Sequence, residues 1–515
     1  MRITNKIMQR NNLSNINTNK TYQDKLSNQM STQKKINRPS DDPVVAIRAL
    51  RLRSNVTEIT QYYSKNIPDA NSWLDVTEDA LKNLSAVVTN MIEQCTKGAN
   101  GDLKSIDRQI ILEQLQALGE EVYTTGDADY AGRYVFTGYR TDTSLSFMST
   151  QTKTYEITEQ LDNSAITKFT KVESGNLKDW TSANYSTLSE SDEQAVESLD
   201  VYRLQLAYNE CSENMTPTIS YKEKDASGNE NAVTIGSTMV HNYAEPSPYK
   251  QVSENPDAVI YVPETGELLL GTNKFEQLMA VKDDVSTVKN EGELQITYQK
   301  DSWLKGDLRP EHYFYCKSDP GTADEIEYNN TFLTGDPERQ VIEYDVGFNQ
   351  TIRVNSTADE CFQHGIGREV DDLVNAMQEV MDLEAVKTKI ESQLSASGDE
   401  ADKKILQTQL DGINKALSLS RDKSQKMFEH GITIFQGYLD DANLSITNCG
   451  TRSRKLELIE NRMQNQKTTF ENLKSVNEDI DITDVAIQLN SAELTYEAAL
   501  MATGKVVQQS LLNFI

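Results

Sequence analysis

Apolar residues recur every three or four positions along a long N-terminal stretch of this chain. From Ala49 to Met91 the spacing alternates between three and four residues, and eleven of the thirteen positions are apolar. At the chain's apolar content of 37%, chance would give about five. This is the a/d pattern of a coiled-coil seam, and it predicts a long helix packed along one face. The residues expected to form this N-terminal seam are Leu52, Val56, Ile59, Trp73 and Leu84.

The start of this helix is also marked. Ser40, Asp41 and Asp42 precede Pro43. Their side chains are candidate caps for the first free N–H groups, and a proline at the first helical position loses no hydrogen bond. Pro68 lies inside the seam, so we expect a kink or a restart of the helix there.

A second run with the same spacing covers residues 456–480 and predicts a partner helix near the C-terminus. A break is expected at residues 477–481. Thr483 or Asp484 would then cap a last helix. The seam residues expected in the second run are Met463, Phe470 and Leu473.

The middle of the chain, residues 139–350, has a different pattern of turns and short alternating segments. Eight of the eleven prolines lie in it, which is typical of a turn-rich region. Two strand-like runs flank residues 225–229. Two β-hairpins are predicted, 259–262 with 267–270 and 341–346 with 351–354.

Both ends of the chain are therefore helical and the middle is not. Helical periodicity returns at residues 369–417, with a loop near 396–399. We expect a mainly α fold with an inserted β-rich domain, in which the N- and C-terminal helices pair in a coiled-coil-like rod. The expected domains are a terminal helical assembly domain (1–42 with 480–515), a helical rod (43–138 with 365–479) and an inserted β-rich outer domain (139–364).

The extreme ends differ from the rest of the chain in charge. Residues 1–20 contain four basic side chains and no acid, and residues 498–515 contain a single charge. An apolar stripe on an unsupported terminal helix needs a neighbour to bury it. The alternative is a helix that folds back onto its own domain. The expected assembly contacts are Ile3, Ile7, Leu13, Leu489, Leu500, Val506, Leu511, Leu512 and Phe514.

Composition limits the classes of partner. The net charge of −28 and the pI of 4.6 argue against binding nucleic acid through phosphates. No apolar run approaches eighteen residues, so no membrane insertion is expected. The first residues are basic but lack the apolar core of a cleaved secretory signal, so export would need another route.

Catalytic and metal-binding motifs are hard to find in this sequence. No motif places a nucleophile beside a base, and neither an enzyme nor a cofactor is expected. The five cysteines are widely spread, without a CxxC motif, so a disulfide framework is not expected. A zinc site remains an alternative to buried thiols, because four residues could supply a Cys2His2 set. These are His312, Cys316, Cys361 and His364.

Four segments of the chain resemble the flagellin superfamily. They are residues 1–20, Ile36–Pro43, Gly132–Tyr139 and Ile480–Ile515. Within that superfamily, the opening Arg2-Ile3-Thr4 and the ending Asn513-Phe514-Ile515 are similar to the hook–filament junction proteins more than to filament subunits. The resemblance covers about residues 1–140 and 365–515, and the central lobe contributes least to it.

The resemblance implies a flagellin-like architecture and a structural function as the adaptor between hook and filament. It also implies secretion through the flagellar type III apparatus to the hook–filament junction. The implied partners are copies of itself in a ring, the first hook-associated junction protein, the flagellin filament and a cytoplasmic export chaperone. Two alternatives stay open: a flagellin-type filament subunit, and a surface protein with a metal-dependent activity in the central lobe.

Overall fold

The chain divides into two compact units in the computed structural model. The structure describes residues 5–188, 196–224, 230–281, 294–333 and 340–512. The first unit comprises residues 1–71, 344–352 and 454–515, and the second comprises residues 72–343 and 353–453. The three-part division expected from the sequence places its boundaries elsewhere and stays a prediction.

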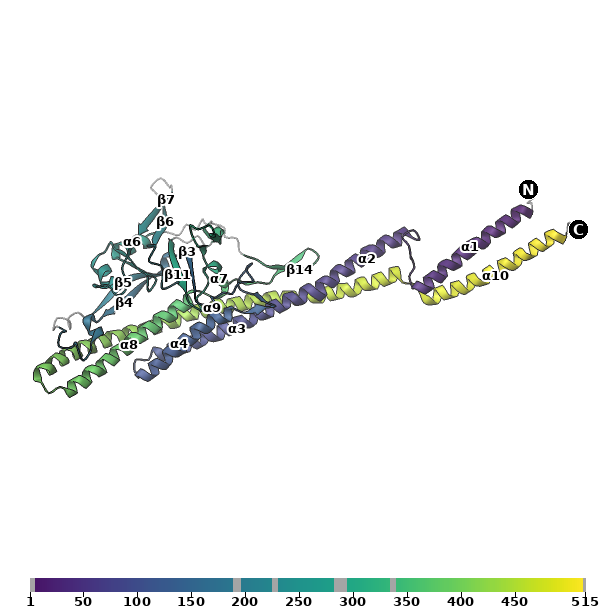
Figure 1. Cartoon of the computed structure of the whole chain (residues 1–515). Helices are drawn as coiled ribbons and strands as arrows, with labels where there is room; N and C mark the ends of the chain where they lie inside the picture. Colours follow the sequence, from purple (N-terminus) through teal and green to yellow (C-terminus); the bar gives the residue numbers. More distant parts are fainter. Residues whose placement is uncertain (1–4, 189–195, 225–229, 282–293, 334–339, 513–515) are drawn as a thin grey trace. The chain divides into compact units, whose positions relative to one another are not determined.

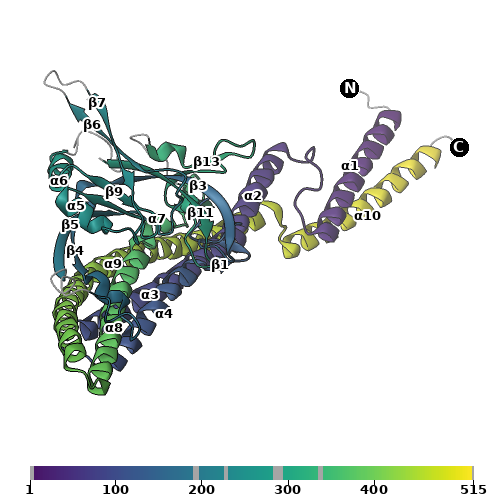
Figure 2. The ribbon, with the colours of Figure 1, turned by 60° about the vertical axis from the view of Figure 1, so that its left-hand side comes forward.

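The first unit is mainly helical, and helices α1 and α10 lie side by side in both views (Figures 1 and 2). Leu26, Val485 and Ala492 are buried between α1 and α10. The predicted pairing of N- and C-terminal helices is therefore confirmed. The helical elements of this unit are α1 (Asn5–Thr32), α2 (Pro43–Gln61), the π-helical turn η1 (Tyr62–Asn66), the start of α3 (Ile67–Gly98), the end of α9 (Glu400–Glu478) and α10 (Ile482–Leu512).

The N-terminal seam is buried as its spacing predicts. Ile59, Trp73 and Leu84 are at most 1% exposed, and Leu52 and Val56 are half-buried. Apolar side chains that repeat every 3.5 residues stay on one side of a helix, so a single face of α2 and α3 collects them.

The C-terminal seam holds at Met463 and Phe470 but not at Leu473, which is 49% exposed. The prediction that Leu473 lies in the seam is wrong. An α-helix with 3.6 residues per turn drifts away from a strict 3.5-residue repeat. The buried face therefore moves one position, to Lys474, which is half-buried. Asn477, one turn further on, donates its side-chain amide to the Val45 carbonyl at 3.2 Å.

The helix does not restart at Pro68. Helices α2, η1 and α3 follow one another directly, and the Ile67 N–H donates to the Tyr62 carbonyl five residues back. A proline lacks an N–H and crowds the carbonyl four residues earlier, so a wider π-helical turn before it accommodates both effects. A short hairpin braces this turn, because Asn66 donates to the Asp345 carbonyl at 2.8 Å.

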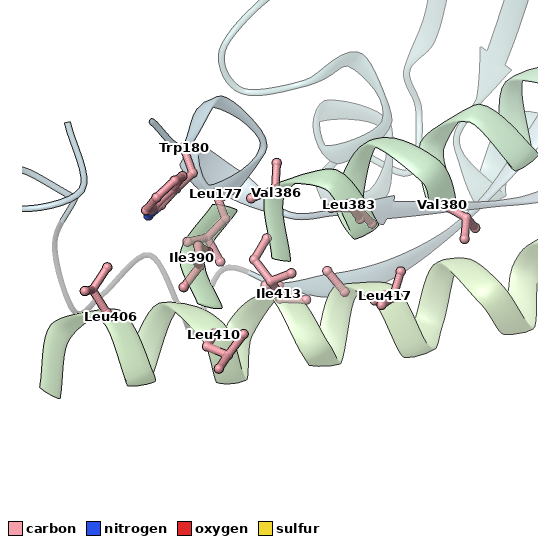
Figure 3. Packing of buried hydrophobic residues seen from close by; sticks show 12 residues of the cluster. Leu177, Trp180, Val380, Leu383, Val386, Ile390, Leu406, Leu410, Ile413 and Leu417 are labelled. Carbon is pink, nitrogen blue, oxygen red and sulfur yellow. The ribbon is translucent and has the colours of Figure 1, made fainter. Parts of the chain in front are cut away.

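The second unit contains a helical hairpin formed by α8 and α9. The predicted loop between them is confirmed, since α8 ends at Ala396 and α9 begins at Glu400. Trp180 lies over this hairpin and donates its indole N–H to Gln409 at 2.8 Å (Figure 3). The helices of this unit are the rest of α3, α4 (Ser105–Gly126), α5 (Pro248–Glu254), α6 (Thr272–Met279), α7 (Ala358–Cys361), α8 (Gly365–Ala396) and the first part of α9.

The β-rich lobe of the second unit is built on two sheets. One has the strand order β4-β5-β10-β9-β8 and the other β13-β12-β3-β11-β6-β7. Except for the parallel pair β8–β9, neighbouring strands are antiparallel. The strands are β3 (Gln151–Leu161), β4 (Ile166–Glu173), β5 (Glu197–Gln205), β6 (Thr218–Lys224), β7 (Glu230–Gly236), β8 (Thr238–Met239), β9 (Val259–Val262), β10 (Glu267–Leu270), β11 (Leu294–Trp303), β12 (Tyr315–Ser318) and β13 (Ile326–Tyr328). Two smaller pairs are β1 (Asp129–Tyr130) with β2 (Arg133–Tyr134), and β14 (Glu343–Gly347) with β15 (Gln350–Arg353).

Both predicted hairpins are confirmed, as β9–β10 and β14–β15. Strands β6 and β7 are the two runs expected around residues 225–229, which themselves lie outside the described residues. The β9–β10 turn requires glycine at Gly266. Its φ is +62°, and a Cβ there would lie 1.9 Å from the Tyr208 carbonyl oxygen.

Candidate assembly surface

The first unit is clamped where α1 ends and α10 begins. The Lys35 N–H donates to the Glu478 carbonyl at 2.7 Å, and the Ile480 N–H donates to the Gln33 carbonyl at 3.2 Å. The Lys34 ammonium pairs with the Asp479 carboxylate beside these bonds. The hydrogen bond from Lys34 lowers the pKa of Asp479. Backbone and side-chain bonds together therefore hold the start of α10 beside the end of α1.

Glu478 is the buried centre of this joint. Its side chain is 3% exposed and accepts two hydrogen bonds from the Arg53 guanidinium, both at 2.7 Å. A bidentate guanidinium–carboxylate pair fixes geometry as well as charge. This hydrogen bonding by Arg53 lowers the pKa of Glu478. Arg53 belongs to α2, so the joint ties α2 to the end of α9.

Of the three predicted cap residues, Asp42 alone caps α2 among the described contacts. Its carboxylate accepts from the N–H groups of Val44 and Val45, at 3.0 and 3.1 Å. Asp41 instead accepts from the N–H groups of the turn before the helix, and Ser40 is exposed in that turn. Ser40 and Asp41 do not cap α2, because only the residue adjacent to Pro43 can reach the second and third N–H groups of the helix.

The cap of α10 also differs from expectation. Asp481 accepts from the N–H groups of Thr483 and Asp484, at 2.9 and 3.3 Å. The prediction that Thr483 or Asp484 is the cap is wrong by two or three residues, because the helix begins at Ile482. The residue just outside the first turn supplies the capping oxygen.

The predicted assembly contacts are in part exposed on the α1–α10 pair. Ile7, Leu13 and Leu500 are exposed, whereas Leu489 is half-buried beside the Val485 cluster. The fold-back alternative thus describes Leu489 in the single chain. Val506, Leu511 and Leu512 lie on α10 at positions whose side chains are not described, and Ile3 and Phe514 lie outside the described residues.

The inner face of α1 is unusually polar for a helix pair. Its buried or half-buried positions follow a 3,4 spacing, but only Ile16, Leu26 and Met30 among them are apolar. Amide side chains occupy the others, and Gln23 donates a long 3.5 Å hydrogen bond across the pair to Glu493. A seam with few apolar contacts buries little hydrophobic area. The other amide positions are Gln9, Asn12, Asn19 and Gln29.

Sequence reasoning missed two further exposed apolar faces. One lies on α2 and the other on α10, outside the positions that the seam uses. A repeat of three residues on α2 and of seven on α10 is visible in the sequence, but neither repeat coincides with the seam spacing. The exposed residues are Val44, Ile47 and Leu50 on α2, and Ile487, Leu494 and Met501 on α10.

The residues considered for a zinc site do not form one. All five cysteines are buried and unpaired, and no group of three or more His, Cys, Asp or Glu side chains in the described residues could hold a metal. His312 shares a hydrogen bond with the Ser144 carbonyl at 3.1 Å, and His364 packs edge-on against Phe314. Burial lowers the pKa of both histidines to about 4.

Among the described residues, none of the helices contains an apolar stretch that could span a lipid bilayer.

Comparison with known proteins gives a match over the N-terminal quarter of the chain. Residues 3–141 match the model of the bacterial flagellin N-terminal helical region. The chain is 30% identical over 143 residues to flagellar hook-associated protein 3 of Salmonella typhimurium, and 29% identical over 145 residues to the protein of that name in Escherichia coli. Each alignment covers 28% of this chain and 45% of the relative, so the match spans about half the length of these relatives.

Two solved structures are also similar in part. Flagellar hook-associated protein 3 of Legionella pneumophila has 12% identity and a TM-score of 0.28, over 82% of this chain and 98% of that one. FlgL of Xanthomonas campestris has 10% identity and the same TM-score, over 82% and 98%. These scores are too low for features of either structure to be transferred. The sequence matches are the informative comparison: residues 3–141 are similar to the bacterial flagellin N-terminal helical region.

Proposed function

We propose that this protein is a structural component of the bacterial flagellum, a junction protein that adapts the hook to the filament. The observation that supports this most directly is the match of residues 3–141 to the flagellin N-terminal region, together with relatives named flagellar hook-associated protein 3. Exposed apolar residues on the paired terminal helices supply the kind of surface that such an assembly needs. Catalysis is not part of the proposal.

The proposed partners are copies of itself in a ring, the first hook-associated junction protein and the flagellin filament. A cytoplasmic export chaperone would accompany the chain before its secretion to the hook–filament junction. In this proposal the ends (1–42 with 480–515) mediate assembly, the rod (43–138 with 365–479) sets spacing, and the lobe (139–364) faces outward. The assembly contacts expected from the sequence belong to the two ends of the chain, and they include Ile7, Leu13 and Leu500.

The test is the position and abundance of the protein on flagella. Cells that lack the gene are complemented with the tagged full-length chain, and labelled antibody is located on isolated flagella by electron microscopy. We expect label at the boundary of hook and filament, at trace amount relative to flagellin. Label along the whole filament, in the amount of its major subunit, would favour the filament alternative, and no label on flagella would reject both.

A truncation tests the role of the ends. Removal of residues 484–515 should leave a folded second unit, because α10 belongs to the first unit, but should abolish swimming. The control is Leu444→Asp, which changes an exposed residue of the second unit and should leave swimming unchanged. Normal swimming of the truncated strain would contradict the proposed role of α10.

A further inference from the structure

Helix α2 presents an exposed row of apolar residues with a basic border. Val44, Ile47 and Leu50 follow one another at every third position, and Leu50 is 63% exposed. Arg48 and Arg51 are exposed on one side of this row, and neither forms an ion pair with the described residues. Residues 1–61 carry eleven basic and four acidic side chains, in a chain whose net charge is −28.

Helix α10 presents a row of the same kind with an acidic border. Ile487, Leu494 and Met501 are seven residues apart and therefore share one side of the helix, and Met501 is 71% exposed. Glu493 and Glu497 are exposed along one edge of this row, and Glu493 also accepts the 3.5 Å hydrogen bond from Gln23 of α1. The α1 helix packs against a different side of α10, where Val485 and Ala492 are buried. The outer row is thus open in a single chain.

We propose that the α2 face of one copy docks against the α10 face of a second copy. This inference rests on the proposed function and names the two surfaces that would meet. Apolar rows would close against each other, and the arginine border would meet the glutamate border. The charge spacings are compatible, since Arg48 and Arg51 are about 4.5 Å apart along their helix and Glu493 and Glu497 about 6 Å.

The two faces differ, and every copy has one of each. A contact between unlike faces is heterologous, so a docked pair still has one open α2 face and one open α10 face for further copies. Such a contact closes as a ring or continues as a helix of subunits. The complementary charge favours a second copy over an acidic or a neutral partner, because a single chain supplies both signs at the two matching borders.

Cross-linking between two different full-length variants tests the contact. Leu50→Cys and Leu494→Cys are prepared separately, mixed at rising concentration and oxidised mildly. We expect a disulfide-linked dimer in the mixture at a yield at least about tenfold above the matched control pair, Leu444→Cys with Leu494→Cys. The five native cysteines are buried, so the unchanged chain should give no dimer.

Two results would overturn the proposal. One is a dimer yield no higher than that of the control pair. The other is an internal disulfide in the doubly substituted L50C/L494C chain without dimer, which would mean that α10 folds onto its own α2.

Charge reversal provides an independent arm. R48E/R51E should lower the cross-linking yield about tenfold, E493K/E497K should do the same, and a chain carrying all four changes should recover it. If the chain with all four changes does not recover the cross-linking yield, the pairing of the arginine border with the glutamate border is contradicted.

Failure of this inference and failure of the proposed function can be told apart. If only the docking model is wrong, label stays at the junction and R48E/R51E cells swim normally. If the proposed function is wrong, the unchanged chain is itself missing from flagella.

Discussion

Removing Arg203 should strongly destabilise the second unit. Arg203 is 7% exposed and donates to Glu267 at 2.9 Å and to Asp372 at 2.6 and 3.2 Å. Burial by itself would lower the pKa of Arg203, but the two carboxylates raise it overall. Glu267 also accepts from the Tyr249 hydroxyl at 2.7 Å. The guanidinium thus joins strand β5 to strand β10 and to helix α8.

The substitution Arg203→Met would leave two carboxylates without their cation in the interior. Breaking a buried ion pair in this way typically costs about 3–5 kcal/mol of unfolding free energy. Adding Glu267→Gln and Asp372→Asn should recover much of the loss.

The assay is urea unfolding of the full chain followed by tryptophan fluorescence. All three tryptophans, Trp73, Trp180 and Trp303, lie in the second unit, so the signal reports on that unit. The control is Lys168→Met, which removes the exposed ion pair with Asp200 and should not change the unfolding midpoint measurably. A loss below about 1 kcal/mol for Arg203→Met would refute the reasoning.

Three other outcomes are expected. Gly266→Ala should lower the free energy of unfolding by more than about 1 kcal/mol, because φ is positive there and a Cβ would overlap a backbone carbonyl. The control is Gly450→Ala on α9, where a Cβ meets no atom within 4 Å. In urea unfolding this control should be neutral or stabilising. Burial raises the pKa of Glu159 to about 7, so stability should fall by up to about 3 kcal/mol as the pH rises from about 4.5 to 7. Thermal melts of Glu159→Gln should lose this slope, and an unchanged slope would exclude Glu159 as its source. In thermal melts, Asp42→Ala should lower the unfolding free energy by about 1 kcal/mol, and Ser40→Ala should lower it much less. Equal losses would contradict the assignment of Asp42 as the cap.

The sequence was most informative where a local repeat determines structure. The seam positions from Leu52 to Leu84 are recognisable because heptad spacing acts over a few turns, and the β9–β10 hairpin is recognisable from its turn residues. The order of strands in the two sheets could not be read, since neighbours such as β3 and β11 are far apart in the chain. The same holds for the ion pair of Arg203 with Asp372, which are 169 residues apart.

The candidate surface was predicted only in part. Ile7, Leu13 and Leu500 are exposed on the terminal helices as expected. The exposed rows on α2 and α10 could not be predicted as exposed, because periodicity alone does not tell which of two apolar faces the chain itself will cover. Leu473 shows the limit of strict heptad reasoning, since one residue of drift moved it from the seam to solvent.

The amide side chains along the inside of α1 have a consequence for how the ends behave. Gln23 loses little when water replaces its partner Glu493, since its amide bonds to water equally well. The polar part of the α1–α10 pair, away from the joint at Glu478, should therefore open more easily than the joint itself. Weak pairing of this kind favours reversible association. Incorrect contacts between subunits dissociate quickly, and stable pairing of α1 with α10 requires further contacts from a correctly bound neighbour.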